Sequence, residues 1–376
     1  MADLEVAVAD QGRDVDLGFR VGAGEVVAML GPNGADKSTT AAVIAGTLRA
    51  DRAVVRVGQR TLSDTGTGVG VAVHRRRVGL LAQEPLLFPH LSALGNVEFA
   101  ARRLGGGRAS LHGNARSRAR DWLARVDAAE LADRKPATLS GGQAQRVALA
   151  RTLAAEPDVV LLDEPLSGLD VAAAAALRAV LRTVLRRDGA GADRPVLLIT
   201  HDLLDVLALA DRVLVVESGR IAEDGSTAAV LGAPRSAFGA RIAGVNVVRG
   251  VLAGPAAVRG PDGRIWHGVA AELLSAEPET EVLAVFSPAS VAVFRQRPQG
   301  SPRNSVCLRV AALEATGSAV RVRTDDQADG APGIAADVTP EAVAELRLAA
   351  GQTAWFTVKA QELRVHAGQR MAMPRR

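Results

Sequence analysis

Cysteine, tyrosine and long apolar runs are scarce or absent in this chain of 376 residues. Its single cysteine, Cys307, forms neither an intramolecular disulfide nor a zinc site on its own, which is typical of a protein from a reducing compartment. No apolar run reaches the roughly 18 residues of a spanning helix, and the N-terminus lacks the basic and apolar segments of a signal peptide. We therefore expect any membrane association to depend on a partner.

Lysine is also rare, because only Lys37, Lys135 and Lys359 occur among the 45 lysines and arginines. The net charge is +4 and the arginines are scattered, with only 3% aromatic residues among them. This distribution is typical of a compositional bias and not of a nucleic-acid surface, so we expect no nucleic-acid partner. Where arginine is the usual cation, a retained lysine indicates a specific role.

Short apolar runs rich in branched residues predict a buried parallel sheet. They lie at 25–30, 158–164 and 195–202, and each is followed by a helical pattern or a turn. Strands that alternate with helices predict a doubly wound α/β core. Helical, Arg/Ala-rich sequence at about 90–156 predicts an inserted helical subdomain within an α/β domain of residues 1–235.

The character of the sequence changes after about residue 235. Short strand-like runs separated by Gly and Pro follow, with one helix in the run TPEAVAEL, capped by Thr339. We expect a strand-rich connecting region at 236–300, a small all-β domain at 301–367 and a loose tail at 368–376.

The segment MLGPNGADKSTT at 29–40 resembles a phosphate-binding loop, G-x-x-x-x-G-K-[ST], in which Asp36 replaces the last glycine. It follows a predicted strand and precedes a predicted helix, so backbone N–H groups and the helix N-terminus would point at phosphates. Lys37 would reach the β- and γ-phosphates, and Ser38 would bind Mg²⁺. The predicted ATP-binding residues of this loop are Gly31, Pro32, Asn33, Gly34, Ala35, Asp36, Lys37, Ser38 and Thr39.

Two further motifs have chemistry that fits such a loop. The strand VVLLDEP ends in Asp163, placed to hold Mg²⁺ through water, and Glu164, placed to polarise the attacking water. In LSGGQ, small residues open a helix and offer free N–H groups to a second anion. Its predicted ATP-binding residues are Ser140, Gly141, Gly142 and Gln143.

Two more elements follow along the chain: SGLD at 167–170 and His201. With these motifs in this order, residues 1–235 resemble the ATP-binding subunits of ATP-binding-cassette transporters. The resemblance implies a P-loop NTPase fold with a RecA-like core and a helical subdomain. It also implies a head-to-tail homodimer that holds each ATP between the phosphate loop of one subunit and the LSGGQ of the other. The implied partners are a transmembrane permease and, indirectly, an extracytoplasmic binding protein. The implied location is peripheral, on the cytoplasmic face of a bacterial plasma membrane.

The resemblance assigns roles residue by residue. Gln83 senses magnesium and the membrane partner, Asp170 communicates across the dimer, and His201 contacts the γ-phosphate. The apolar segment QEPLLFPHLS after Gln83 is either local packing or a surface near the permease. The implied catalytic residues are Lys37, Glu164 and His201, the magnesium ligands are Ser38, Gln83 and Asp163, and Gln83, Asp163 and Asp170 complete the ATP-binding set.

Residues 301–367 resemble the Mop-like (TOBE) form of OB-like domains that bind molybdate. A tetrahedral dianion requires converging hydroxyl, guanidinium and ammonium donors. Ser301, Arg303 and Lys359 would supply them, with Asn304 orienting the loop. The alternative is that an arginine-rich chain offers such trios by chance. The cassette is similar to actinobacterial molybdate-import ATPases, while sulfate, tungstate and ferric-ion import stay open.

Two positions depart from the family pattern. No aromatic residue lies in 1–18 to stack on adenine, so stacking falls to Arg13 or is weak. At position 36, a carboxylate about 4 Å from a phosphate charge is repelled by roughly 4 kcal/mol at an effective dielectric constant near 20. Three explanations of Asp36 stand: a recent single-base change or sequence error, a deliberate loss-of-function substitution, or a natural regulatory subunit.

The sequence thus predicts the ATP-hydrolysing motor of an oxyanion importer, most simply for molybdate, with ATP and Mg²⁺ as cofactors and Asp36 impairing ATP binding. The alternative from another class is a non-hydrolytic oxyanion-sensing subunit on the same scaffold. A soluble DNA-repair ATPase is disfavoured, because no long coiled-coil insertion splits the cassette.

Overall fold

The computed structural model describes residues 2–32, 34–102, 112–186, 193–271, 280–329 and 331–367. The chain forms two compact units, Met1–Thr227 and Ala228–Arg376. The division falls a few residues before the predicted boundary at 235. Asn33, residues 103–111 within the predicted helical subdomain, and the predicted tail at 368–376 lie outside the described residues.

A six-stranded sheet forms the centre of the N-terminal unit, in the order β11-β10-β3-β9-β8-β7. Five of its strands are parallel neighbours, and β11 pairs antiparallel with β10. The predicted doubly wound α/β core is confirmed. The bounds are β3 Val26–Leu30, β7 Val78–Leu81, β8 Val159–Asp163, β9 Val196–Ile199, β10 Arg212–Glu217 and β11 Arg220–Ser226.

Alternation along these strands places their side chains in two cores. Val27 and Met29 pack with the helix α1 (Lys37–Ala45) in one core. Val26 and Val160 pack into the other core, which includes the helices of the helical subdomain. The central sheet is therefore buried on both faces, which explains its continuous apolar runs.

A second, antiparallel sheet covers α1, in the order β2-β1-β4-β5-β6. Its strands contribute Leu4, Val6 and Val55 to the core that holds α1. Sequence reasoning did not identify this sheet, although buried and exposed residues alternate regularly along its first two strands. The bounds are β1 Leu4–Asp10, β2 Val15–Val21, β4 Arg52–Val57, β5 Arg60–Asp64 and β6 Val69–Gly70, with short 3₁₀ turns at Gln11–Arg13 and Val73–Arg75.

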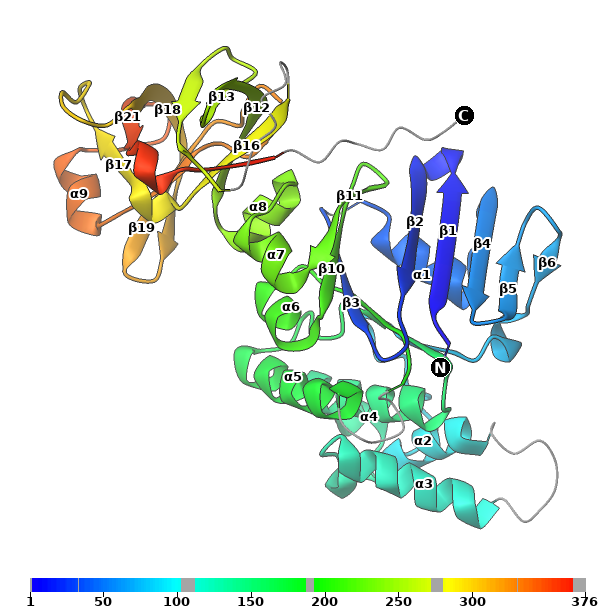
Figure 1. Cartoon of the computed structure of the whole chain (residues 1–376). Helices are drawn as coiled ribbons and strands as arrows, with labels where there is room; N and C mark the ends of the chain where they lie inside the picture. The colour runs from blue at the N-terminus through cyan, green and yellow to red at the C-terminus, as the bar shows by residue number, and fades with distance from the viewer. Residues whose placement is uncertain are drawn as a thin grey trace. The chain divides into compact units, whose positions relative to one another are not determined.

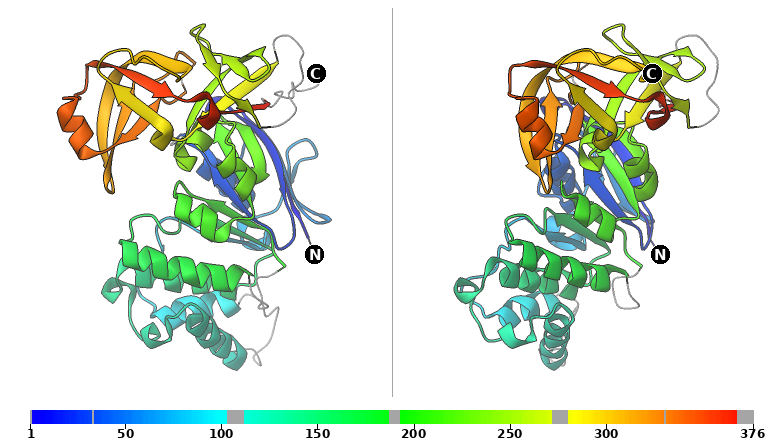
Figure 2. Two further views of the ribbon diagram at one scale, coloured as in Figure 1. Left: turned by 60° about the vertical axis from the view of Figure 1, so that its left-hand side comes forward. Right: turned by 90° about the vertical axis from the view of Figure 1, so that its left-hand side faces the viewer.

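The predicted helical subdomain is confirmed. Its helices cluster at one end of the N-terminal unit (Figures 1 and 2) and pack around Leu94, Trp122 and Leu149. The bounds are α2 Ala93–Ala101, α3 His112–Arg125 and α4 Gly141–Ala154, with 3₁₀ turns at Ala129–Leu131 and Pro136–Thr138; α5 Val171–Arg186 and α6 Leu203–Leu209 follow. Across the described segments, we find no helix with both the length and the apolar composition for crossing a bilayer.

The C-terminal unit is built mainly from two sheets, in the orders β14-β13-β12-β16-β22-β15 and β17-β21-β18-β19-β20. Both sheets share one core that includes Trp266, Phe286, Val310 and Phe356. The predicted division at residue 300 falls inside this shared core. The helices are α7 Thr227–Gly232, which begins at the unit boundary, α8 Ala237–Ala243 and α9 Pro340–Glu345, with 3₁₀ turns at Pro288–Ser290 and Ala360–Glu362. The strands are β12 Asn246–Gly254, β13 Ala257–Arg259, β14 Ile265–His267, β15 Val269–Ala270, β16 Glu281–Phe286, β17 Val291–Phe294, β18 Asn304–Thr316, β19 Ala319–Thr324, β20 Ala335–Val338, β21 Thr353–Val358 and β22 Arg364–Ala367.

Candidate nucleotide-binding site

Three predicted motifs meet at one edge of the central sheet. The strands β3, β8 and β9 are parallel neighbours, so their carboxyl ends lie side by side. The phosphate loop follows β3, Asp163 ends β8, and His201 comes two residues after β9. Ligands of open α/β sheets bind at this edge, and the backbone N–H of Glu164 ties two of the segments by donating to Ile199 O across 2.9 Å.

Asp36 occupies the position where the family pattern has glycine. Its backbone is left-handed, with φ 58° and ψ 27°, and it precedes the first residue of α1. Asp tolerates this conformation better than most residues with a Cβ, although glycine adopts it without strain. Its Oδ1 accepts a hydrogen bond from Thr39 Oγ1 across 2.9 Å. A carboxylate therefore lies at the helix N-terminus, the position that also favours a phosphate.

Lys37 is buried and satisfied by the loop itself. Its Nζ donates to Gly31 O at 2.9 Å and Pro32 O at 2.8 Å. Burial lowers the pKa of the Lys37 ammonium, while the nearby carboxylates of Glu164, Asp163 and Asp36 act in the opposite direction. The cation is therefore held over the loop by two of its carbonyl oxygens.

Ser38 and Asp163 bring two oxygen donors together. Ser38 Oγ donates to Asp163 Oδ1 across 3.2 Å, and burial raises the pKa of Asp163. Hard oxygen donors of this kind fit Mg²⁺, which usually keeps several waters and is held by few protein groups. Gln83 instead donates through Nε2 to Ser167 Oγ at 3.3 Å. Within the described residues, it makes no hydrogen bond to Ser38 or Asp163.

The structure brings Glu164 and His201 together, with 3.4 Å between Glu164 Oε1 and His201 Nδ1. The backbone of Glu164 is left-handed, with φ 46°, which is unusual for a residue other than glycine. Glu164 is half-buried, whereas the His201 side chain is 60% exposed. His201 Nδ1 is thus placed to orient the carboxylate of Glu164.

A buried ion pair supports the segment that contains His201. Arg178 of α5 donates through Nε and Nη2 to Asp205 Oδ1, at 2.8 and 2.6 Å. Thr200 Oγ1 donates to the other oxygen of Asp205 at 2.9 Å. Burial raises the pKa of Asp205, and the hydrogen bonds from Arg178 and Thr200 partly offset this rise. Sequence reasoning missed Arg178 and Asp205, because their pairing depends on how α5 and α6 pack.

The LSGGQ motif caps the helix α4. Gln143 N donates to Ser140 Oγ at 3.3 Å, and Ser140 N donates to Gln143 Oε1 at 3.0 Å, which forms a capping box. The N–H groups of Gly141 and Gly142 have no partner within the helix, as expected for first-turn residues. A Cβ at Gly142 would lie 3.1 Å from Ala173 Cβ, so the site also requires a small residue there.

Asp170 has a local structural role. Its Oδ1 accepts from Ala173 N across 2.8 Å at the start of α5. The carboxylate therefore fixes the end of the SGLD turn.

The segment after Gln83 is held by helix α4. Gln145 Nε2 donates to Ala82 O at 3.3 Å, and Arg151 donates to Leu86 O at 2.7 Å and Pro85 O at 3.0 Å. Phe88 packs against Arg151 and Phe99, whereas Leu86 is 64% exposed. The segment thus combines local packing with an exposed apolar tip. Sequence reasoning did not find Gln145 or Arg151 as its anchors, because neither belongs to a local motif of the segment.

Comparisons with known proteins agree with this geometry. A family model for the ABC transporter matches residues 15–167, and one for the TOBE domain matches residues 300–365. The molybdenum import ATP-binding protein ModC of Mycobacterium tuberculosis is 56% identical over 96% of this chain and 96% of its own length. The chain belongs to the ABC transporter family. The predictions of an ABC-type ATPase and of a C-terminal TOBE domain are confirmed.

Other members of the ABC family share the scaffold at lower identity. The Fe(3+) ions import protein FbpC of Streptomyces coelicolor is 37% identical over 82% of this chain and 90% of its own length. The sulfate/thiosulfate import protein CysA of Methylococcus capsulatus is 37% identical over 86% of each chain. Among solved structures, the dimeric ATP-binding cassette MJ0796, in a post-hydrolysis state bound to ADP and Pi, gives a TM-score of 0.50 at 27% identity, over 60% of this chain and 99% of its own.

The predicted oxyanion residues of the TOBE region lie at one end of a strand pair. Asn304 of β18 and Val358 of β21 form the last pair of their ladder, so Arg303, just before β18, and Lys359, just after β21, lie directly beyond it. Ser301, Arg303 and Lys359 are all exposed. Asn304 is buried and exchanges two hydrogen bonds with the backbone of His267, at 2.7 and 2.8 Å. It therefore anchors the start of β18.

Arg13, the alternative for adenine stacking, lies in the first 3₁₀ turn. Its backbone N–H donates to Asp10 Oδ1 at 3.1 Å, and its side chain lies 3.7 Å from the same carboxylate. The side chain is 44% exposed. The partly exposed guanidinium of Arg13 is compatible with stacking on adenine, but these contacts do not require that role.

Proposed function

We propose that this chain is the ATP-hydrolysing subunit of a molybdate importer, which acts as a head-to-tail homodimer on a separate permease at the cytoplasmic face of the membrane. The observation that carries the proposal is the 56% identity to ModC over nearly the whole chain, compared with 37% to iron and sulfate relatives. Tungstate or sulfate as the cargo is the nearest alternative.

The phosphate loop and its neighbours would bind the nucleotide. Lys37 would exchange the carbonyl oxygens of Gly31 and Pro32 for β- and γ-phosphate oxygens, a charge-assisted contact. Ser38 and Asp163 would hold Mg²⁺, with Gln83 joining them after leaving Ser167. The magnesium ion, when bound, would neutralise phosphate charge.

Glu164 and His201 would act at the γ-phosphate. Glu164 Oε1 is half-buried and would accept a hydrogen bond from the attacking water, which orients that water and increases its nucleophilicity. His201 Nδ1, 3.4 Å away, would orient this carboxylate or contact a phosphate oxygen. The support from Asp205 and Thr200 would keep the histidine loop in place.

The second half of each ATP site would come from another copy of the chain. The capping box of Ser140 and Gln143 pre-forms the start of α4, where the N–H groups of Gly141 and Gly142 are available to a γ-phosphate. The dimeric state of the related cassette MJ0796 supports this arrangement.

Asp36 would weaken nucleotide binding in both sites of such a homodimer. Its carboxylate lies at the N-terminus of α1, where the partial positive charge of the helix dipole would otherwise stabilise a phosphate. The hydrogen bond from Thr39 holds it there. We estimate a net loss of about 3–5 kcal/mol after partial compensation by Lys37 and Mg²⁺.

A second candidate function follows from this residue. If the carboxylate prevents nucleotide binding altogether, the chain would serve as an oxyanion-sensing regulatory subunit with no hydrolysis of its own. The intact pair of Glu164 and His201 favours the motor, because a sensor has no use for it.

Transport with the cognate permease tests the function. Membrane vesicles with the permease, its extracytoplasmic binding protein and this subunit, either wild type or Asp36→Gly, are loaded with ATP, and uptake of molybdate, tungstate, sulfate and Fe³⁺ is measured. We expect ATP-dependent molybdate uptake that is larger with Asp36→Gly. Uptake of sulfate or iron alone would contradict the cargo, and no ATP-dependent uptake with either subunit would favour the sensor.

A further inference from the structure

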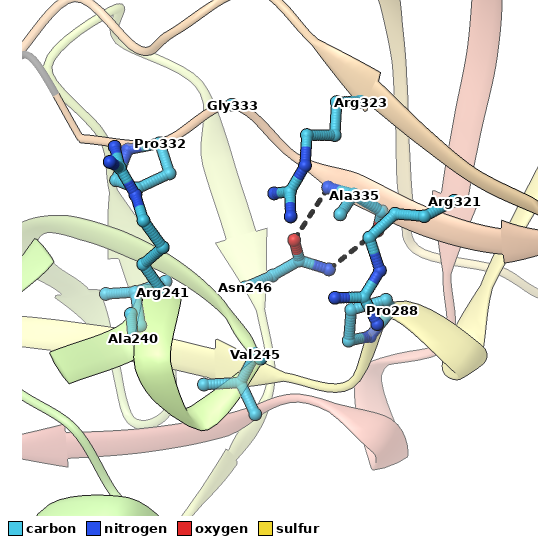
Figure 3. Close-up of a pocket in the computed structure, with 12 residues that line it drawn as sticks. Ala240, Arg241, Val245, Asn246, Pro288, Arg321, Arg323, Pro332, Gly333 and Ala335 are labelled. Carbon is cyan, nitrogen blue, oxygen red and sulfur yellow. Dashed lines mark hydrogen bonds between the residues drawn. The ribbon is translucent and has the colours of Figure 1, made fainter. Parts of the chain in front are cut away.

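The C-terminal unit contains a small cavity lined by three arginines. Arg241 comes from the last turn of α8, and Arg321 and Arg323 come from β19. The two β19 residues are separated by one position and therefore share a face of the strand. Figure 3 shows the three side chains arranged around Asn246. None of the described residues that line the cavity is acidic.

The three guanidinium groups have more donors than their protein partners use. Arg321 donates through Nε and Nη2 to the two oxygens of Asp337, at 2.7 and 2.8 Å, so its Nη1 is left over. Arg323 uses only Nε, which donates to Glu314 at 2.9 Å. Arg241 has no carboxylate partner within the described part of the chain. The cavity therefore carries one uncompensated positive charge and several free N–H donors.

The walls of the cavity are fixed by buried hydrogen bonds. Asn246 is 4% exposed and accepts from Ala335 N at 2.7 Å while donating to Ala335 O at 2.8 Å (Figure 3). Gln327 Nε2 donates to Val247 O at 2.7 Å and Pro332 O at 2.8 Å. These contacts join β12 to the first residue of β20 and to the segment before it, and they hold the lining in one arrangement. A preorganised site loses less free energy on binding.

The size of the cavity limits its ligand. About 20 Å³ is open to a water-sized sphere, which is room for one or two waters or a compact ion but not for an organic molecule. Guanidinium groups match the oxygens of tetrahedral oxyanions through paired N–H donors. The charge, the donors and the size together favour a compact anion.

We propose that this cavity binds a single tetrahedral oxyanion of the phosphate, sulfate and molybdate class. It is separate from the predicted site of Ser301, Arg303 and Lys359, because none of these residues lines it. A bound anion would connect α8 to β19, two elements that are distant in the sequence, and so stabilise the C-terminal unit. The proposal does not depend on nucleotide binding or hydrolysis.

Equilibrium dialysis of the full chain against phosphate, sulfate or molybdate, at constant ionic strength set with chloride, tests the proposal. Arg241→Ala is the main variant, since this exposed side chain has no carboxylate partner among the described residues and its loss is compatible with folding. Arg259→Ala, which removes an exposed arginine of β13 outside the cavity, is the matched control. The anion that binds most tightly identifies the occupant of the cavity. Tightest binding of molybdate would indicate the transported anion, and tightest binding of phosphate or sulfate would indicate a common cellular anion.

We expect Arg241→Ala to bind at least one of the three anions about tenfold more weakly than wild type and Arg259→Ala do. Arg241→Lys should be intermediate, because it keeps the charge without the paired donors. The thermal midpoint should rise with this anion in wild type and not in Arg241→Ala. Equal binding by wild type and Arg241→Ala for all three anions would overturn the proposal. So would anion binding that is lost only in Arg303→Ala and Lys359→Ala, or in a Lys37→Ala variant of the phosphate loop.

Discussion

Thr39 Oγ1 donates a hydrogen bond to Asp36 Oδ1 across 2.9 Å, within the first turn of the helix that follows the phosphate loop. This bond keeps a carboxylate at the helix N-terminus, where the backbone of Asp36 is left-handed. An anion supplied by the chain itself therefore occupies the electrostatic position that would otherwise favour a phosphate.

Asp36→Gly should tighten ATP binding by roughly 100- to 3,000-fold, because it removes both the repulsion and the backbone strain. Asp36→Asn is the matched control: it has nearly the same shape, tolerates a left-handed backbone and lacks the charge. We expect it to recover most of the gain. Titration with a fluorescent ATP analogue measures all three. Equal affinities for wild type and Asp36→Asn would assign the loss to strain and refute the electrostatic account.

Asp205→Ala should destabilise the N-terminal unit by about 2–4 kcal/mol, since it removes the nearer and buried carboxylate partner of Arg178 and leaves only Asp202 at 3.2 Å. Chemical unfolding followed by circular dichroism measures this. Asp202→Ala is the control, because Asp202 is more exposed and makes one contact of 3.2 Å with the same arginine. Since Asp202 Oδ1 also caps α6 by accepting from Leu204 N at 2.7 Å, we expect this variant to lose about 1 kcal/mol. A similar loss in both variants would mean that the buried pair has no special importance.

Asp337→Asn should lower the stability of the C-terminal unit near neutral pH by about 1 kcal/mol, through loss of the paired bonds from Arg321. The hydrogen bonds from Arg321 lower the pKa of Asp337 below its ordinary value of 3.8. The stabilisation is therefore fully present above this value and is lost as the pH falls through the lower folded pKa. Urea unfolding should show a constant advantage of wild type between pH 7 and pH 5 that shrinks below about pH 4. An advantage that grows on acidification would contradict this sign.

Arg76→Ala should cost about 2–4 kcal/mol, because the buried guanidinium donates to carbonyl oxygens of Val43, Ile44 and Val71 and to Ser63 Oγ. Burial lowers the pKa of Arg76. The carbonyl oxygens at the C-terminal end of α1 stabilise the charged guanidinium. Arg76→Lys should recover only part of the loss. Thermal unfolding checks the order wild type, Lys, Ala, and an unchanged midpoint in the Ala variant would contradict it.

The grouping of motifs at the carboxyl edge of the central sheet was predictable from the sequence because each motif is local. The phosphate loop, Asp163–Glu164 and LSGGQ each lie on a short continuous segment, and parallel strands bring the ends of the first two together. Gln83 is different: its predicted role concerns magnesium, whereas its side chain contacts Ser167 in the structure.

Residues that act through tertiary contacts were not predictable in the same way. Arg76 is one of many arginines, and its acceptors come from separate segments. Arg178 and Asp205 meet only because α5 packs against α6. The arginine-lined cavity likewise requires α8 to lie beside β19. In an arginine-rich sequence, the arginines with specific contacts can be identified only once the fold shows which of them meet a partner or line a cavity.

Steady-state ATP hydrolysis by Asp36→Gly, with and without Glu164→Gln, tests the central claim most directly. We expect Asp36→Gly to hydrolyse ATP much faster than wild type at sub-millimolar ATP. Adding Glu164→Gln should remove hydrolysis while leaving ATP affinity nearly unchanged, because the carboxylate orients water and does not hold the nucleotide. Hydrolysis at the wild-type rate in Asp36→Gly would contradict the role assigned to Asp36, hydrolysis that survives Glu164→Gln would contradict the role of Glu164, and no hydrolysis by Asp36→Gly would contradict the motor itself.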